Sequence, residues 1–234
     1  MMNILHILKK EFKGYFVSPI AYIVISIFLI ISGWFFFSTF FIYNQTELRN
    51  FFTLLPVIFS FIVPAVTMRL FSEEFNTGSY ELLLTMPVTT LDIIIGKFLA
   101  ASAFVALMLF PTLSYGFFIS FLGELDWGPV IGGYIGAVLL GAAFSSIGLF
   151  ASSLTRNQII SFIIGMIVCF TLTLLDKILF FLPESALGIF QFLGADFHFQ
   201  NISRGIIDSR DIFYFLSICF VMLYSTNLVI QGKK

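Results

Sequence analysis

Six long runs without a formal charge divide this chain, and they limit its possible folds more than any other feature. They cover residues 20–43, 51–68, 98–123, 127–155, 157–175 and 212–232. Each run is close to or above the ~18 residues needed to cross a bilayer as a helix. The pattern therefore predicts six transmembrane helices.

Composition excludes a soluble globular domain. Hydrophobic residues make up 59% of the chain and charged residues 11%, and the mean hydropathy is +1.03. So few polar side chains cannot cover a water-facing surface. Because six spans use most of the 234 residues, we expect a single all-α integral membrane domain over residues 1–234. The net charge of −1 and the lack of a basic cluster do not indicate a nucleic-acid partner.

Residues 69–92 interrupt the apolar pattern with a polar segment between the second and third spans. Charged residues of this segment and of the start of the third span are Arg69, Glu73, Glu74, Glu81, Asp92 and Lys97. Such a segment is too costly to place in hydrocarbon, so we expect it at a membrane surface. Arg69 and Glu73 stand four residues apart, which predicts an ion pair on a first short helix.

Capping signals divide this polar segment into short helices. The run from Asn76 to Gly78 predicts a break, and Thr77 or Ser79 can cap the helix that follows. Thr89, with Asp92 three residues later, matches a capping box that opens the next membrane helix. We interpret the segment as a bent lever on a membrane surface, with an ordinary polar loop as the alternative.

The distribution of Lys and Arg orients the chain. If the N-terminus is cytoplasmic, that side collects eight of the twelve basic residues, and the other side holds four. The positive-inside preference therefore predicts that both termini lie in the cytoplasm. The polar segment 69–92 then faces the cytoplasm, as does the short turn at Arg156.

Two further segments are amphipathic. Residues 1–18 place apolar side chains on one helical stripe apart from three lysines, which predicts an interfacial helix. Residues 183–211 are too long for a simple turn, and we expect two short helices that re-enter the outer leaflet. Asp196 and His198 lie within this outer segment, but without a nearby third ligand no metal site is predicted.

The fourth span carries a stripe of small residues at every fourth position. Small side chains in a membrane helix let a neighbouring helix approach closely. The stripe predicts helix packing, and a substrate groove is the alternative interpretation. Its members are Gly133, Ala137, Gly141 and Ser145.

The polar segment resembles the signature region of the ABC-2 type transporter permeases. In that family the pattern is an arginine, paired acids, a glycine before E-L-L-L, a proline, and a G-K at the third helix. The branch it is most similar to includes the gliding-motility-associated permeases and the permease of nitrous-oxide-reductase maturation. The matching residues here are Arg69, Ser72-Glu73-Glu74, Thr77 to Leu84, Met86-Pro87 and Gly96-Lys97.

This resemblance implies a permease whose cytoplasmic coupling helix docks on an ATP-binding subunit. The chain has no G-x-x-x-x-G-K-[ST] motif, so ATP and Mg²⁺ are expected on a separate polypeptide. It also implies a second permease copy or a paralogue, a bacterial inner membrane and the export of a hydrophobic or amphipathic substrate. The residues expected at or beside the ATPase contact are Arg69, Glu73, Glu74, Gly78, Glu81 and Arg156.

Other functions stay open on the sequence alone. A component of a gliding-motility or secretion machine would use the same ATP-driven coupling. A polytopic membrane enzyme needs converging reactive groups, but the two histidines stand far apart and no catalytic residues are predicted. An ion-coupled secondary transporter usually carries ionisable groups at the midplane, whereas these spans are nearly free of charge.

Overall fold

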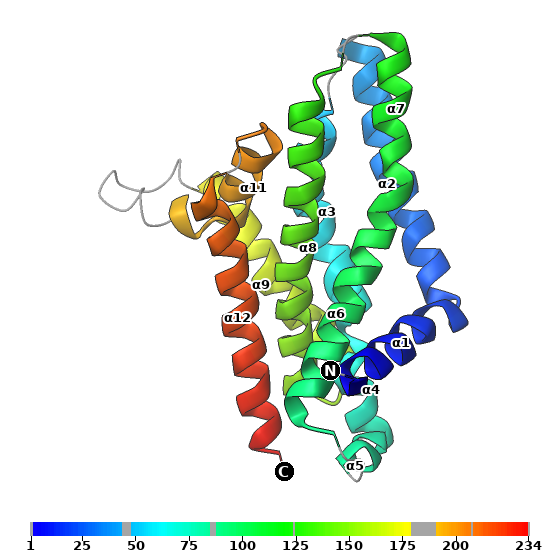
Figure 1. The fold of residues 1–234 in the computed structure, drawn as a ribbon, viewed down its shortest axis with the longest axis vertical. Helices are drawn as coiled ribbons and strands as arrows, with labels where there is room; N and C mark the ends of the chain where they lie inside the picture. Colours follow the sequence, from blue (N-terminus) through cyan, green and yellow to red (C-terminus); the bar gives the residue numbers. More distant parts are fainter. Residues whose placement is uncertain are drawn as a thin grey trace.

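The computed structural model is entirely helical over the residues that it describes, which are 2–43, 48–84, 88–123, 125–178, 191–206 and 208–233. Figure 1 shows a bundle of long helices with two shorter groups at its ends. The elements are α1 (Met2–Val17), α2 (Ile20–Tyr43), α3 (Arg49–Thr67), α4 (Arg69–Thr77), α5 (Ser79–Leu84), α6 (Thr90–Leu109), η1 (Phe110–Thr112), α7 (Leu113–Leu122), α8 (Trp127–Leu154), α9 (Gln158–Ile178), α11 (Ala195–Ser203) and α12 (Ser209–Gln231).

Six helical segments among the described residues are long and apolar enough to cross a membrane, as the sequence predicted. The largest differences from the expected bounds are in the second and third segments: α4 extends the second to Thr77, and the third starts eight residues before Phe98. The segments are Ile20–Ser38, Arg49–Thr77, Thr90–Phe121, Trp127–Leu154, Gln158–Lys177 and Ser209–Gln231.

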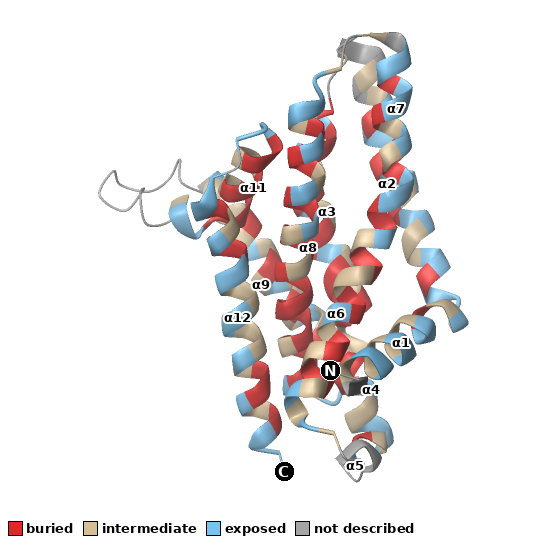
Figure 2. Ribbon diagram, viewed as in Figure 1, coloured by how far each residue is buried: buried red, intermediate tan, exposed pale blue. Residues whose placement is uncertain are grey.

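Helix α8 forms the centre of the bundle. It packs against α3, α6, α9, α11 and α12, and also against α4. Figure 2 shows it with buried positions on most of its faces, whereas α12 is exposed along much of its outer side. Glycines explain this central place, since a Cβ at Gly148 would lie 1.9 Å from the Thr67 hydroxyl oxygen of α3. Without a side chain at this position, α8 has room for the Thr67 side chain of α3.

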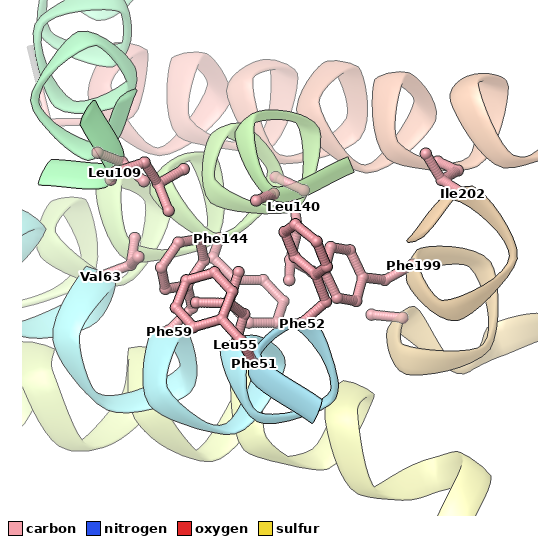
Figure 3. Close-up of a cluster of buried hydrophobic side chains, with 14 of the residues drawn as sticks. Phe51, Phe52, Leu55, Phe59, Val63, Leu109, Leu140, Phe144, Phe199 and Ile202 are labelled. Carbon is pink, nitrogen blue, oxygen red and sulfur yellow. The ribbon is translucent and has the colours of Figure 1, made fainter. Parts of the chain in front are cut away.

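Two apolar cores lie one above the other along the bundle. The first joins α3, α8 and α11 and contains Phe52, Phe59, Phe144 and Phe199, all nearly inaccessible (Figure 3). The second lies near α4 and joins it to α1, α6 and α8 through residues such as Phe71 and Phe104. The α4 segment is thus packed on the bundle by its own apolar core.

Prolines in the interior of the second and third spans have different effects on the helix. Pro111 lies in the single 3-10 turn η1, and this turn separates α6 from α7. Proline lacks the amide hydrogen of a continuous helical ladder, which accounts for the interruption. In α3, by contrast, Pro56 and Pro64 are accommodated within one helix.

Helices occur in both segments that the sequence marks as amphipathic, residues 1–18 and 183–211. Helix α1 lies across the bundle and packs on α6 (Figure 1), where a Cβ at Gly96 would lie 2.7 Å from Ile7. In the predicted outer segment 183–211 the structure describes α11 and the start of α12. The first of the two short helices expected there lies largely outside the described residues, as do Met86 and Pro87.

Candidate coupling site

The site begins at the junction between α3 and α4, where one residue, Met68, separates the two helices. Its backbone is helical, with φ −53° and ψ −31°. A continuous helix would bond the amides of Phe71 and Ser72 to the carbonyls of Thr67 and Met68. Here both amides instead donate to the hydroxyl oxygen of Ser152 in α8, at 2.9 and 3.0 Å.

The Ser152 hydroxyl in turn donates to the Met68 carbonyl at 2.8 Å. One side chain of α8 therefore satisfies three backbone groups at the break. A side chain inserted into the helical ladder is a recognised cause of a helix bend. Helix α4 has no side-chain cap from its own sequence, so Ser152 takes the place of its N-cap residue.

A buried cationic group fixes the other side of α4. Lys97 of α6 is 1% exposed. Its ammonium donates to Oε1 of Glu74 in α4 at 2.7 Å, to Oε1 of Glu11 in α1 at 3.1 Å, and to the Leu70 carbonyl at 2.7 Å. The ring centroid of Phe71 lies 5.2 Å from the same nitrogen. All three ammonium hydrogens are used, and three helices meet at one charge.

The buried charges of this cluster make separation of its three helices energetically costly. A buried charge is tolerated only when it is paired and hydrogen-bonded, and removing one partner leaves a costly unpaired charge. The two carboxylates are 13% and 17% exposed, and Oε2 of Glu74 is buried without a hydrogen-bond partner among the described residues. Relative motion of α1, α4 and α6 would separate these charges and is strongly opposed.

Arg69 does not make the ion pair that its spacing predicted. Among the ion pairs of the described residues none joins Arg69 to Glu73. The guanidinium carbon instead lies 5.3 Å from the ring centroid of Tyr15 in α1. Tyr15 is 2% exposed, and its hydroxyl donates a long 3.4 Å bond to the Val66 carbonyl. Burial raises the pKa of Tyr15, with a smaller contribution from Glu11, so the phenol stays neutral and Arg69 packs over its ring.

The predicted break after α4 is confirmed at Gly78, which has φ +72° and ψ 1°. Glycine adopts this left-handed conformation without steric cost. Thr77 ends α4 and Ser79 begins α5, so neither is the residue before the second helix. Their hydroxyls bond to each other at 2.9 Å across the turn. Glu81 lies in the first turn of α5 and is exposed.

A groove runs between α1 and α4, and three of the six predicted coupling residues line it: Arg69, Glu73 and Glu74. Its volume is about 350 Å³. Glu73 is exposed at its side, whereas Glu74 is turned toward Lys97. The structure thus gives the paired acids different surroundings. The lining residues are Lys10, Glu11, Gly14, Tyr15, Arg69, Leu70, Glu73, Glu74, Thr77 and Ser79.

The C-terminal end of the chain also contacts α4. The ammonium of Lys233 lies 4.4 Å from the ring centroid of Phe75 and donates to the Ser153 carbonyl at 2.6 Å. Partial burial lowers the pKa of Lys233, and the charge of Arg156 lowers it further. The effect on Lys233 places Arg156 near this end of α4. Arg156 is exposed, so its guanidinium is accessible.

The capping box that opens the third span is present as predicted. The Thr89 hydroxyl accepts from the Asp92 amide, and an Asp92 carboxylate oxygen accepts from the Thr89 amide, both at 3.2 Å. The cap fixes the start of α6 at Thr90. It therefore sets the helical position of Lys97 relative to α4.

The small-residue stripe of the fourth span lies on α8 against two different neighbours. A Cβ at Gly133 would lie 2.4 Å from the Phe52 ring, and one at Gly141 would lie 2.5 Å from Val105. Ala137 and Ser145 are fully buried. The stripe therefore contacts α3 and α6 at positions where a larger side chain has no room.

The outer residues considered as metal ligands make separate contacts. His198 Nδ1 lies 2.6 Å from a carboxylate oxygen of Asp211, and Nε2 lies 2.8 Å from the Phe192 carbonyl oxygen. Asp196 pairs with Lys177 at 2.7 Å. Asp196 and His198 thus use different partners, and no group of three potential ligands occurs among the described residues.

Sequence reasoning missed Glu11, Ser152 and Lys233 as parts of this site and noted Lys97 only within a motif. Lys97 carries the one signal that could have found it, since it is a lone charge beside a long apolar run, where an ionisable residue usually has a partner. Its partner Glu11 lies 86 positions away. No local spacing identifies such a pair.

These features define a polytopic, all-helical membrane protein with a polar helix fixed at one end. The family model for ABC-2 family transporter protein matches residues 5–202, which is most of the chain. The chain therefore belongs to the ABC-2 transporter family, whose membrane subunits are permeases of ABC transporters. No curated protein matches the sequence significantly.

Proposed function

We propose that this chain is the permease subunit of an ATP-driven exporter and that a separate ATPase binds α4 and α5. Both termini would lie in the cytoplasm of a bacterial inner membrane. The family match and the excess of Lys and Arg on the side of the termini support this orientation. Two copies, or one copy and a paralogue, would form the transport pathway.

The observation that carries the proposal is the fixed attachment of α4. Its inner face is joined to α6 and α1 through Lys97 and to α8 through Ser152. Glu73 and Glu81 remain exposed on the same segment. A segment that is firmly connected to three helices and presents free charges suits the transmission of force from a partner.

The proposed path of force follows these contacts. The partner would bind ATP and Mg²⁺, and its cycle of ATP binding and hydrolysis would displace α4. Displacement of α4 would move α6 with it, because separating Lys97 from Glu74 exposes two charges to an apolar environment. It would also move α8 through the Ser152 hydroxyl. Helix α8 contacts α3, α6, α9 and α12, so it can pass the displacement to most of the bundle.

The substrate that fits this proposal is hydrophobic or amphipathic, because the spans present apolar side chains. The similarity of the polar segment to gliding-motility-associated permeases favours one alternative, in which the same coupling drives a motility or secretion machine. Both versions need the ATPase contact at α4 and α5. The experiment below therefore tests what they share.

Charge reversal at the exposed acids tests the ATPase contact. The chain, unmodified or carrying Glu73→Lys and Glu81→Lys singly and together, would be co-expressed with a candidate ATP-binding subunit and purified. We expect the double variant to insert normally but to lose most of the co-purified ATPase and of the transport-coupled ATP hydrolysis. Exposed rim charges each contribute modestly, so the effect should be larger in the double variant.

Arg210→Glu is the control, because Arg210 is exposed at the start of α12, far from α4. It changes the charge by two units, as each single reversal does but with the opposite sign, and should leave ATPase binding intact. Normal binding and coupled hydrolysis in the double variant would exclude this surface as the coupling contact. Equal loss in Arg210→Glu would show a general charge effect and would contradict the proposal.

A further inference from the structure

A second cavity lies at the opposite end of the bundle from α4. It has a volume of about 280 Å³ and lies where α3 and α8 begin and α11 ends (Figure 1). Nothing in the coupling mechanism uses it. Its lining includes Arg49, Leu125, Asp126, Pro129, Val130 and Arg204.

The charges around this cavity favour an anion. Arg49 and Arg204 are both exposed, and neither forms an ion pair with any residue that the structure describes. The one acid of the lining, Asp126, already accepts a hydrogen bond from the Gly128 amide at 3.0 Å, which caps α8. The first turn of α3 has no side-chain cap, so the positive end of its dipole adds to the two guanidinium groups.

The wall that carries Arg204 is held in a fixed position. A Cβ at Gly132 of α8 would lie 2.4 Å from the Ile202 carbonyl oxygen, so this glycine allows α11 to contact the backbone of α8. Gly205 has φ +84°, and a Cβ there would lie 3.3 Å from the Pro129 nitrogen. A left-handed glycine and a close backbone contact thus set the turn that presents Arg204.

Apart from Ser203, the remaining lining residues are apolar. The ends of two spans set the depth of the cavity in the bilayer. Phe52, Val130 and Pro129 line the cavity, and two of the candidate membrane spans begin at Arg49 and Trp127. Arginine and tryptophan at the ends of spans lie at the level of lipid headgroups. A ligand here would place a polar group among headgroups and an apolar part against the bundle.

We propose that this cavity binds the phosphate group of an anionic phospholipid. Arg49 and Arg204 would contact the phosphate oxygens, because guanidinium groups match the geometry of oxyanions. Leu125 and Pro129, the half-buried apolar residues of the lining, would contact the glycerol and the first methylenes of the lipid. This inference concerns ligand binding and does not depend on the ATPase contact.

The test measures lipid binding by the full chain in the absence of any ATPase. Purified protein in a neutral detergent would be titrated with short-chain phosphatidylglycerol and followed by native mass spectrometry. Arg49→Gln and Arg204→Gln should each weaken binding about tenfold, as expected for the loss of a charge-assisted hydrogen bond. Arg210→Gln is the matched control, since Arg210 is exposed at the same end but does not line the cavity, and it should bind as the unmodified chain does.

Two further titrations identify the source of the phosphate. Inorganic phosphate at millimolar concentration should compete only weakly, because it makes no use of the apolar wall, and a neutral diacylglycerol should not bind in an Arg49-dependent way. Strong competition by inorganic phosphate would indicate that the cavity binds a free anion and not a lipid, and it would overturn the proposal. Equal binding by all three variants would also overturn it. Since no ATPase is present, either failure leaves the proposed coupling function untouched.

Discussion

Replacing Lys97 with methionine tests the idea that one buried charge holds α4 to the bundle. Methionine keeps the length of the side chain but removes the ammonium and its three hydrogen bonds. Breaking a buried pair by removing one partner costs ~3–5 kcal/mol. Because Glu74 and Glu11 are 13% and 17% exposed, water can partly solvate them, and we expect a cost near the lower limit, ~3 kcal/mol. That is a change of more than about a hundredfold in the unfolding equilibrium constant.

The assay is equilibrium unfolding in detergent micelles, followed by the loss of helical circular dichroism. Lys10→Met is the control, since Lys10 also pairs with Glu11, at 3.7 Å, but is 65% exposed. Such an exposed pair contributes ~0–1 kcal/mol. Adding Glu74→Gln to Lys97→Met should recover part of the loss, because it removes one of the unpaired charges. The reasoning is refuted if Lys97→Met costs no more than Lys10→Met, or if the two changes are simply additive.

Two further predictions concern α8. Ser152→Ala removes the hydroxyl that binds two amides and one carbonyl of the α3–α4 junction, and we expect a loss of ~1–2 kcal/mol; amide hydrogen exchange should speed up at the start of α4, and unchanged protection there would contradict the bridging role. Gly148→Val places a side chain 1.9 Å from the Thr67 oxygen, which should cost ~3 kcal/mol or more and lower the thermal midpoint in detergent. Gly14→Ala, where a Cβ meets nothing within 4 Å, should not lower that midpoint, since alanine favours a helix by ~0.5–1 kcal/mol over glycine; a midpoint in Gly148→Val as high as in Gly14→Ala would argue against close packing of α3 on α8.

The features that the sequence predicted well are those that depend only on residues close together in the chain. The six spans follow from apolar runs, and the capping box of Thr89 and Asp92 follows from a three-residue spacing. The break at Gly78 follows from the glycine's conformational freedom. In each case the cause and the effect lie within one helical turn or one membrane thickness.

The features that could not be predicted are those that depend on packing between distant segments. The spacing of Arg69 and Glu73 allowed an ion pair, but the ring of Tyr15 in α1 lies beside Arg69 in the folded chain. The two acids at 73 and 74 look equivalent in the sequence, yet only Glu74 faces Lys97. Which face of α4 is buried depends on where α1 and α6 lie. No pattern of neighbouring residues predicts the positions of these two helices.

The junction at Met68 has a mechanical consequence. Without the inserted hydroxyl, residues 49–77 could run as one rod, roughly 43 Å long at the usual helical rise. The interruption between α3 and α4 therefore depends on a neighbouring helix, because it needs Ser152 of α8 to lie level with Met68. Sliding α8 by a single turn, about 5.4 Å, would withdraw the Ser152 oxygen from the junction and allow the helical hydrogen bonds of α3 to continue into α4.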